Sequence, residues 1–301
     1  MRKGIVCIMA GAVAALGFVI CLAPANAGRG EEASSIVRIG MVGTLFRDTP
    51  AALLEPMTRP FKALLEAQTG CKGQMVLAKD GEELLKKLQA EQVEFGVFNG
   101  FEFAWARQKD AKLKPLVIAI NQYSHLKAFV VVHKDSSVTC LADLRGKSVA
   151  LPRFSRAHCH LFLERRCQDC GGAPKDFFAE LTKPQDAEAA LDQVADGTIQ
   201  AAIVDKQALD NYEKMKPGWF SEVKIAQESE PFPATVVSYV DGGIEEATLR
   251  RFREGLIKAN QTRTGKQVLG MCRITAFKDI PADFEQTLQN IAKVYPPPDA
   301  E

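Results

Sequence analysis

The sequence predicts an α/β protein with largely parallel sheets. Apolar runs of strand length alternate along the chain with longer runs that have apolar residues at helical spacing. Glycine, proline and polar turn residues separate these runs. Strands that alternate with helices form βαβ units, and the strands of such units run parallel.

The first hundred residues contain three predicted strands and two predicted helices. The apolar run at residues 36–42 has strand length, and residues 53–69 have helical spacing up to Gly70, which ends the helix. A strand at 74–77, a helix at 81–89 and a strand at 94–98 follow.

The alternation continues to residue 239. Further strands are predicted at residues 116–120, 129–133, 148–151, 201–204 and 235–239. In parallel sheets, ligands bind beyond the carboxyl ends of the strands. We therefore expect a binding site at the loops after Val42, Phe98, Leu151 and Val204.

The segment at residues 141–158 has the pattern of an anion-binding site. It predicts a short helix, a turn at Gly146 and Lys147, and a buried strand that Pro152 ends. A second helix then starts with Ser155 at its N-cap. The first N–H groups of a helix lack partners within it and lie at the positive end of its dipole, so an oxyanion can satisfy both.

The four loops carry side chains that can bind an oxyanion. These candidates are Thr44, Asn99, Ser155, Arg156, His158 and Asp205. Hydroxyl and amide groups donate hydrogen bonds, and a guanidinium can donate two in parallel to one oxyanion. Each candidate also has a structural interpretation, since Ser155 can be a cap, Asn99 part of a turn and Arg156 a solvated charge.

The N-terminus predicts export. Arg2 and Lys3 precede an uncharged apolar run at residues 4–22, and Ala25-Asn26-Ala27 is a small-residue cleavage signal. We expect a signal peptide at residues 1–27 and a periplasmic protein. A membrane anchor is the alternative, because the run approaches the roughly 20 residues that span a bilayer.

Composition excludes some classes of partner. Without residues 1–27, Lys and Arg fall from 38 to 36 against 37 Asp and Glu, a net charge of −1 that does not indicate nucleic-acid binding. The remaining chain, about 270 residues, fits one large domain or two lobes.

Six cysteines remain after residue 27, and an even number in an exported protein predicts disulfides. They are Cys71, Cys140, Cys159, Cys167, Cys170 and Cys272. On one continuous helix Cys159 and Cys170 would be about 16 Å apart, beyond disulfide reach. Residues 158–170 also allow a metal site or thiol redox chemistry as alternatives, although no second C-x-x-C completes a zinc site.

Motifs of common enzyme classes do not occur in the sequence. It has no G-x-S-x-G elbow, no P-loop, no H-E-x-x-H and no dinucleotide fingerprint. We therefore expect a binding protein without a cofactor.

The chain resembles the PhnD-like phosphonate-, phosphite- and phosphate-binding subunits of ABC transporters, which are type II periplasmic binding proteins. The resemblance rests on the order of VEFGVFNGFEFAWA at residues 93–106, FVVVHKDSSVTCLADLRGKSVA at 129–150, GTIQAAIVD at 197–205 and AQESEPFPATVV at 226–237. It implies two α/β lobes, with residues 36–125 and 234–301 in lobe I and residues 126–233 in lobe II. Two crossover strands, near residues 124–128 and 231–236, would act as the hinge.

The resemblance also implies a function and further site residues. It implies a monomer that captures a small oxyanion by hinge closure and delivers it to an ABC transporter; an anion sensor that signals to a membrane receptor is the alternative. Tyr123 would line the cleft and Asp205 would contact the ligand. Where the family has Ser-Thr-Ser-Gly, this chain has Ser155, Arg156, Ala157 and His158, and the arginine favours an anion of higher charge or different shape.

Overall fold

The strands of the part of the chain that the structure describes form two mixed sheets and one two-stranded ribbon. The computed structural model describes residues 36–47 and 49–298, and the predicted signal peptide at residues 1–27 lies outside them. Within the described residues, no helix has the length and apolar character needed to cross a membrane.

The first sheet has six strands in the order β13-β4-β12-β3-β1-β2. They are β1 (Ile36–Val42), β2 (Lys72–Ala78), β3 (Phe95–Phe98), β4 (Leu113–Ile120), β12 (Thr235–Val240) and β13 (Ala276–Lys278). β1 pairs in parallel with β2 and β3, as the βαβ pattern predicts.

The prediction of largely parallel sheets is wrong for the other strands of this sheet. β12 runs antiparallel to β3 and β4, and β13 runs antiparallel to β4. The chain leaves the sheet after β4 through β5 (His125–Leu126) and returns through β11 (Phe232–Pro233). Because β5 and β11 pair antiparallel, β12 enters the sheet where β4 left it and must run the opposite way.

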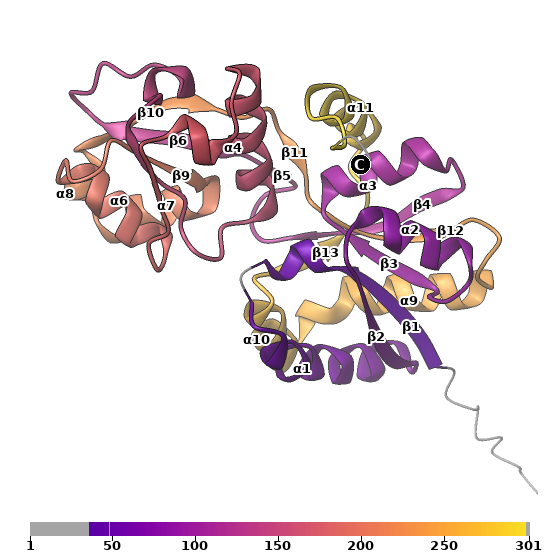
Figure 1. The fold of residues 1–301 in the computed structure, drawn as a ribbon. Helices are drawn as coiled ribbons and strands as arrows, with labels where there is room; N and C mark the ends of the chain where they lie inside the picture. Colours follow the sequence, from indigo (N-terminus) through magenta and orange to yellow (C-terminus); the bar gives the residue numbers. More distant parts are fainter. Residues whose placement is uncertain (1–35, 48, 299–301) are drawn as a thin grey trace, which may run out of the picture. The chain divides into compact units, whose positions relative to one another are not determined.

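Helices cover both faces of this sheet (Figure 1). α1 (Ala51–Thr69), α9 (Glu246–Lys258) and α10 (Arg263–Met271) pack on one face, and α2 (Gly81–Gln89), α3 (Gly100–Lys109) and α11 (Phe284–Val294) on the other. Gly70 ends α1 with φ +71°, a left-handed conformation that glycine adopts without a steric cost. Asp80 caps α2 by accepting a hydrogen bond from Glu83 N–H.

The second sheet has five strands in the order β10-β6-β9-β7-β8. They are β6 (Ala128–His133), β7 (Ser148–Ala150), β8 (Glu180–Thr182), β9 (Ala201–Asp205) and β10 (Val223–Glu228). β7 runs parallel to β8 and β9, while β6 runs antiparallel to β9 and β10. β10 is an edge strand.

Two apolar cores form on the faces of the second sheet. One core lies beneath the 3-10 helix η2 (Leu141–Leu144), α4 (Ala157–Asp169) and α5 (Pro174–Phe177). The other lies beneath α6 (Ala187–Ala195) and α7 (Lys206–Met215), which α8 (Pro217–Phe220) follows. Each face therefore buries its apolar side chains against helices.

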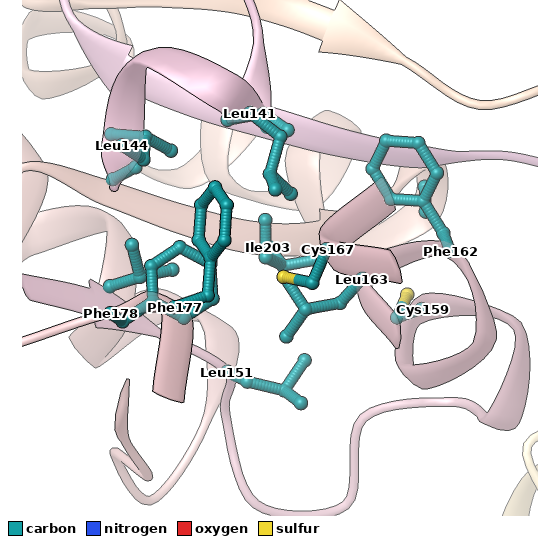
Figure 2. Packing of buried hydrophobic residues seen from close by; sticks show 14 of the residues in the cluster. Leu141, Leu144, Leu151, Cys159, Phe162, Leu163, Cys167, Phe177, Phe178 and Ile203 are labelled. Carbon is teal, nitrogen blue, oxygen red and sulfur yellow. The ribbon is translucent and has the colours of Figure 1, made fainter. Parts of the chain in front are cut away.

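The cysteines of α4 belong to the first of these cores. Figure 2 shows Cys159 and Cys167 among Leu141, Leu163 and Phe177. Cys140, Cys159, Cys167, Cys170 and Cys272 are thiols, so the predicted disulfides are wrong at these positions. Cys159 and Cys167 cannot pair because eight residues of continuous helix separate them by about 12 Å.

Candidate functional site

The loop after β1 meets the loop after β3 at a buried carboxyl group, that of Glu102. Thr44 Oγ1 donates to Glu102 Oε2 at 2.7 Å. Asn99 Nδ2 donates to the same oxygen at 2.8 Å and to Thr44 Oγ1 at 2.9 Å. The backbone of Gly81 donates to this carboxyl group as well. Three loops at the carboxyl ends of β1, β2 and β3 are thereby tied together.

Glu102 itself was not predicted as a site residue. It is 3% exposed, and burial raises the pKa of its carboxyl group, against the opposing effect of its hydrogen bonds. A glutamate within the aromatic run at residues 101–105 is a sequence signal that could have identified it. Thr44 and Asn99 therefore bind a group of the protein in this structure.

The loop after β7 meets the loop after β9 at an ion pair. Arg156 Nε lies 3.3 Å from Asp205 Oδ2, and the two side chains are 22% and 17% exposed. Asp205 also caps α7, because its Oδ1 accepts from the N–H of Ala208 at 2.7 Å. This cap fixes the carboxylate, which in turn orients the guanidinium.

Arg156 has further contacts with neighbouring loops. Its Nη2 donates to Gln207 Oε1 and to the carbonyl oxygen of Arg273, each at 3.3 Å. Asn121 Nδ2 donates to the same Gln207 oxygen. An incoming anion would therefore compete for Arg156 with Asp205 and Gln207.

His158 lies on the first turn of α4 and is 3% exposed. Burial lowers the pKa of its imidazole to about 4; Asp205 opposes this shift, and Arg156 adds to it. A hydrogen bond to the Lys127 backbone holds the ring, which packs 5.5 Å from the ring of Phe232. The imidazole is therefore neutral at neutral pH.

The prediction that Ser155 caps α4 is wrong. The helix begins at Ala157 with Arg156 as its N-cap residue, and no side chain caps it. Ser155 Oγ instead donates to the carbonyl oxygen of Pro152 at 2.7 Å. Ser155 N–H also donates to Pro152 O, at 3.2 Å, so Ser155 belongs to the turn that begins at Pro152. The helix therefore begins one residue later than predicted.

Tyr123 lies before β5 and is held by α7. Its hydroxyl donates to Asp210 Oδ2, and Lys206 Nζ lies 2.6 Å from Asp210 Oδ1. Lys206 Nζ also lies 5.3 Å from the centre of the Tyr123 ring, within the range of a cation–π contact.

These residues surround a small pocket, which we call the anion pocket. Its lining includes Tyr123, Arg156, His158 and Asp205 of the predicted site residues, with Asn121, Gln122, His125, Leu126, Lys127, Lys206 and Gln207. Thr44, Asn99 and Ser155 are not part of this lining. The open space is about 10 Å³, room for about one water molecule, so a larger anion needs the lining side chains to move apart.

The charges of the anion pocket suit an anion. Three cations, Lys127, Arg156 and Lys206, and one carboxylate, that of Asp205, line the pocket. Arg156 is paired with Asp205, and the two lysines are paired with Glu228 and Asp210 outside the lining. Lys127 and Gln207 were not predicted as site residues. A sequence signal for Gln207 is its position in the first turn of α7, whose N-cap is Asp205. Lys127, directly before β6, has no comparable signal in the sequence.

The histidines and cysteines at residues 158–170, which suggested a metal site or thiol redox chemistry, are not arranged for either. Across residues 36–47 and 49–298, no group of three His, Cys, Asp or Glu side chains could hold a metal ion. Burial raises the pKa of the Cys159 thiol, and it raises that of Cys167 to about 12. Thiols with such high pKa values supply little of the thiolate that redox chemistry needs.

The family of periplasmic substrate-binding proteins of phosphonate ABC transporters matches residues 45–284. The chain belongs to this family. The match confirms the resemblance that the sequence motifs predicted. Proteins of the family bind substrates for transport rather than converting them, and they act in the periplasm. No curated protein matches the sequence.

Solved structures share the fold at low sequence identity. A Xanthomonas citri protein bound to ATP is 17% identical with a TM-score of 0.58, over 87% of this chain and 97% of that one. PhnD1 of Prochlorococcus marinus in complex with methylphosphonate is 15% identical with a TM-score of 0.57, over 86% and 98%. A binding protein component of a phosphonate ABC transporter of Pseudomonas aeruginosa is 14% identical with a TM-score of 0.54, over 86% and 85%. These likenesses confirm the fold of a type II periplasmic binding protein.

Proposed function

We propose that the protein captures a phosphonate, or a related phosphorus oxyanion, at the anion pocket and delivers it to an ABC transporter. The observation that carries this proposal is the position of Arg156 at the start of α4, next to Lys127 and Lys206. A guanidinium, two ammonium groups and the N–H groups of a helix start are all donors to an oxyanion. The family match favours transport over sensing.

Capture would follow from closure of two lobes. The six-stranded sheet would be the core of lobe I, residues 36–125 and 234–301, and the five-stranded sheet that of lobe II, residues 126–233. The ribbon of β5 and β11 would be the hinge, and Pro233 in β11 restricts its backbone. Closure would bury the ligand, and the closed form would dock on the permease.

The roles of the individual residues are part of the proposal. Arg156 would bind the anion, Asp205 would orient Arg156, and Tyr123 and His158 would form the walls. Thr44, Asn99 and Ser155 stay predicted ligand contacts, although each donates to a protein oxygen in this structure. The protein would be a monomer exported by a signal peptide cleaved after Ala27, and it would catalyse no reaction.

Thermal unfolding of residues 28–301 with a series of anions tests this proposal. Methylphosphonate, phosphite, phosphate, methanesulfonate and zinc would each be added at a fixed concentration. A ligand at about a thousand times its dissociation constant stabilises the folded state by about 4 kcal/mol. We expect a clear rise in Tm with at least one phosphorus oxyanion. A rise with zinc alone would contradict the proposal.

A further inference from the structure

A larger groove adjoins the anion pocket. Four residues, Tyr123, His125, Lys127 and Lys206, line both spaces. The groove encloses about 470 Å³, within the range of small-molecule sites. Its apolar lining comes from four elements, β6, α7, α8 and β10, and consists of Phe129, Leu209, Phe220 and Ile225. The carboxylates of Asp210, Glu213 and Glu228 also line it. We call it the apolar groove.

A β-bulge in the edge strand β10 shapes the apolar groove. Ile225 pairs with Val131 and Glu228 with Phe129 on the neighbouring strand β6. Directly paired residues share a face of the sheet, so Ile225 and Glu228 both lie on the face of Phe129. Residues three apart on a regular strand point to opposite faces of the sheet. The β-bulge between Ile225 and Gln227 adds one residue to β10 and so brings Glu228 to the same face as Ile225.

The helices leave this part of the sheet uncovered. Val131, the partner of Ile225, is fully buried beneath α6 and α7, whereas Ile225 is 49% exposed. Phe129 and Leu209, at 3% and 5% exposure, lie deeper. The apolar groove is thus a lateral opening into the core of the second sheet.

Two lysines stand where the apolar groove meets the anion pocket. Lys127 Nζ lies 2.9 Å from Glu228, and Lys206 Nζ lies 2.6 Å from Asp210. Their side chains are 34% and 41% exposed, so water competes for these ion pairs and either lysine can exchange its partner for an incoming anion. The two ammonium groups can donate to an oxyanion at the junction. The carboxylates of Asp210, Glu213 and Glu228 line the groove beyond it and would repel a second anionic group, so they favour an uncharged end of the ligand there.

We propose that the apolar groove binds the organic substituent of a phosphonate whose head group is held at the anion pocket. This inference rests on the proposed function and narrows its ligand class to phosphonates with an apolar or aromatic substituent of about four carbons or more. A phosphonate has a carbon atom in place of one phosphate oxygen, so one direction from phosphorus carries no oxygen. The bond from phosphorus to this carbon would point past Lys127 and Lys206, and the substituent would enter the apolar groove.

Calorimetric titration with methylphosphonate and n-butylphosphonate tests the inference. The two ligands share the head group and differ by three methylenes. Each methylene moved from water into an apolar site strengthens binding roughly fourfold. We expect n-butylphosphonate to bind at least tenfold more tightly than methylphosphonate. n-Butanesulfonate carries the same butyl group on a sulfonate, so it measures whether the tail binds with a different head group.

Ile225→Glu places a carboxylate in the apolar groove without removing a buried group. We expect this variant to lose the preference for n-butylphosphonate while its affinity for methylphosphonate stays within about twofold. Met215→Glu is the matched control, since Met215 is 68% exposed at the end of α7 and lines neither space. If Ile225→Glu does not fold, Ile225→Thr removes apolar area at the same position and should lower the preference in part.

The outcomes separate this inference from the proposed function. Equal affinity of the wild-type protein for both phosphonates would overturn the inference and leave the proposed function standing. A preference that survives Ile225→Glu would place the substituent elsewhere and overturn the inference as well. If neither phosphonate binds, the inference is overturned, and the proposed function is overturned with it only if phosphite and phosphate do not bind either.

Discussion

Arg156 is the least exposed of the three cations that line the anion pocket. Its guanidinium is only 22% exposed and is held by the carboxylate of Asp205. The loops after β7 and β9 come together because these strands are parallel neighbours in the sheet. The sequence predicted this meeting of loops, and the 3.3 Å distance between the two side chains agrees with it.

We expect Arg156→Ala to weaken methylphosphonate binding by about 10- to 100-fold. Hydrogen bonds to a charged group contribute about 1.5–3 kcal/mol, and the variant leaves Asp205 to repel the ligand. Isothermal calorimetry at neutral pH measures the change. Arg153→Ala is the control, because Arg153 is an exposed cation of the same loop. Equal affinities of Arg156→Ala and the wild-type protein would remove Arg156 from the site.

The buried imidazole of His158 should make stability depend on pH. Its pKa is about 4 in the folded protein and about 6.5 when unfolding exposes it. Between these values the unfolded chain binds the additional proton, so the free energy of unfolding falls as the pH drops from 6.5 to 4. From pH 7.5 to pH 5 we expect a loss of about 2 kcal/mol from this residue.

Urea unfolding of wild-type protein and His158→Gln at pH 7.5 and pH 5 measures this loss. The variant keeps a polar side chain but does not titrate, so its pH difference should be smaller by about 2 kcal/mol. His133→Gln, which changes a half-exposed histidine at the end of β6, should retain the wild-type difference. The same pH difference in His158→Gln as in the wild-type protein would show that His158 is not the source.

At the scale of elements, the start of α3 lies against the ribbon. A Cβ atom added to Gly100 would come within 2.2 Å of the Pro233 carbonyl oxygen and 2.7 Å of that of Ala234. Both contacts are with backbone atoms, which cannot rotate away as a flexible side chain would. Glycine is therefore required where α3 meets β11.

We expect Gly100→Ala to destabilise the protein by about 1–3 kcal/mol, because the two backbones must move apart. Gly270→Ala is the matched control, since Gly270 lies on α10 and a Cβ there has no atom within 4 Å. Alanine at that position should stabilise α10 by up to about 1 kcal/mol. Urea unfolding compares both variants with the wild-type protein, and unchanged stability of Gly100→Ala would mean that the ribbon adapts.

The elements that the sequence predicted are those with strong apolar periodicity. The strand at residues 36–42 and the helix at 81–89 have the predicted bounds. β5, β8, β11 and β13 have two or three residues each, too few for a recognisable period. β10 was missed because its residues are mainly half-buried or exposed and a bulge interrupts their alternation.

The candidate site was predicted in part for a related reason. Residues at the ends of parallel strands follow from the fold, and Arg156, His158 and Asp205 were found in this way. Lys127 and Asn121 lie beside the ribbon, whose position depends on how distant segments pair. The contact of Thr44 and Asn99 with Glu102 depends on a side chain that faces inward from α3, which spacing alone did not identify.

At the scale of the whole molecule, the C-terminal helix contributes to the cores of both sheets. Phe284 and Leu288 of α11 pack into a core of the six-stranded sheet, whereas Ile291 and Tyr295 pack into a core of the five-stranded sheet. Tyr295 is fully buried, and its ring centre lies 4.6 Å from that of Phe232 in the ribbon. We call each sheet with the helices that cover it one half of the molecule. The folding of the two halves should therefore be coupled.

Polar contacts of Tyr295 also join the two halves. Trp105 of α3 donates from its indole to the Tyr295 carbonyl oxygen at 2.7 Å. The Tyr295 hydroxyl donates to Glu230, which also accepts two hydrogen bonds from Arg166 of α4, at 2.7 and 2.8 Å. Burial and the carboxylate of Glu230 raise the pKa of Tyr295, so the hydroxyl keeps its proton and remains a donor.

We expect Tyr295→Ala to lower the free energy of unfolding by about 3–5 kcal/mol and to separate the unfolding of the two halves. Trp219 on α8 reports on the five-stranded sheet, and Trp105, although it lies on α3, packs against a core of that sheet as well. The six-stranded sheet is given its own reporter by Phe61→Trp on α1, in a protein whose other tryptophans are replaced by phenylalanine, because Phe61 packs against a core of that sheet. In single-tryptophan proteins the two urea transitions should coincide with Tyr295 present and differ in midpoint with alanine in its place. Tyr295→Phe keeps the ring and loses only the hydroxyl, so its transitions should still coincide. Coincident transitions in Tyr295→Ala would show that the contacts that remain, among them Ile291 and the ribbon, are enough to couple the halves.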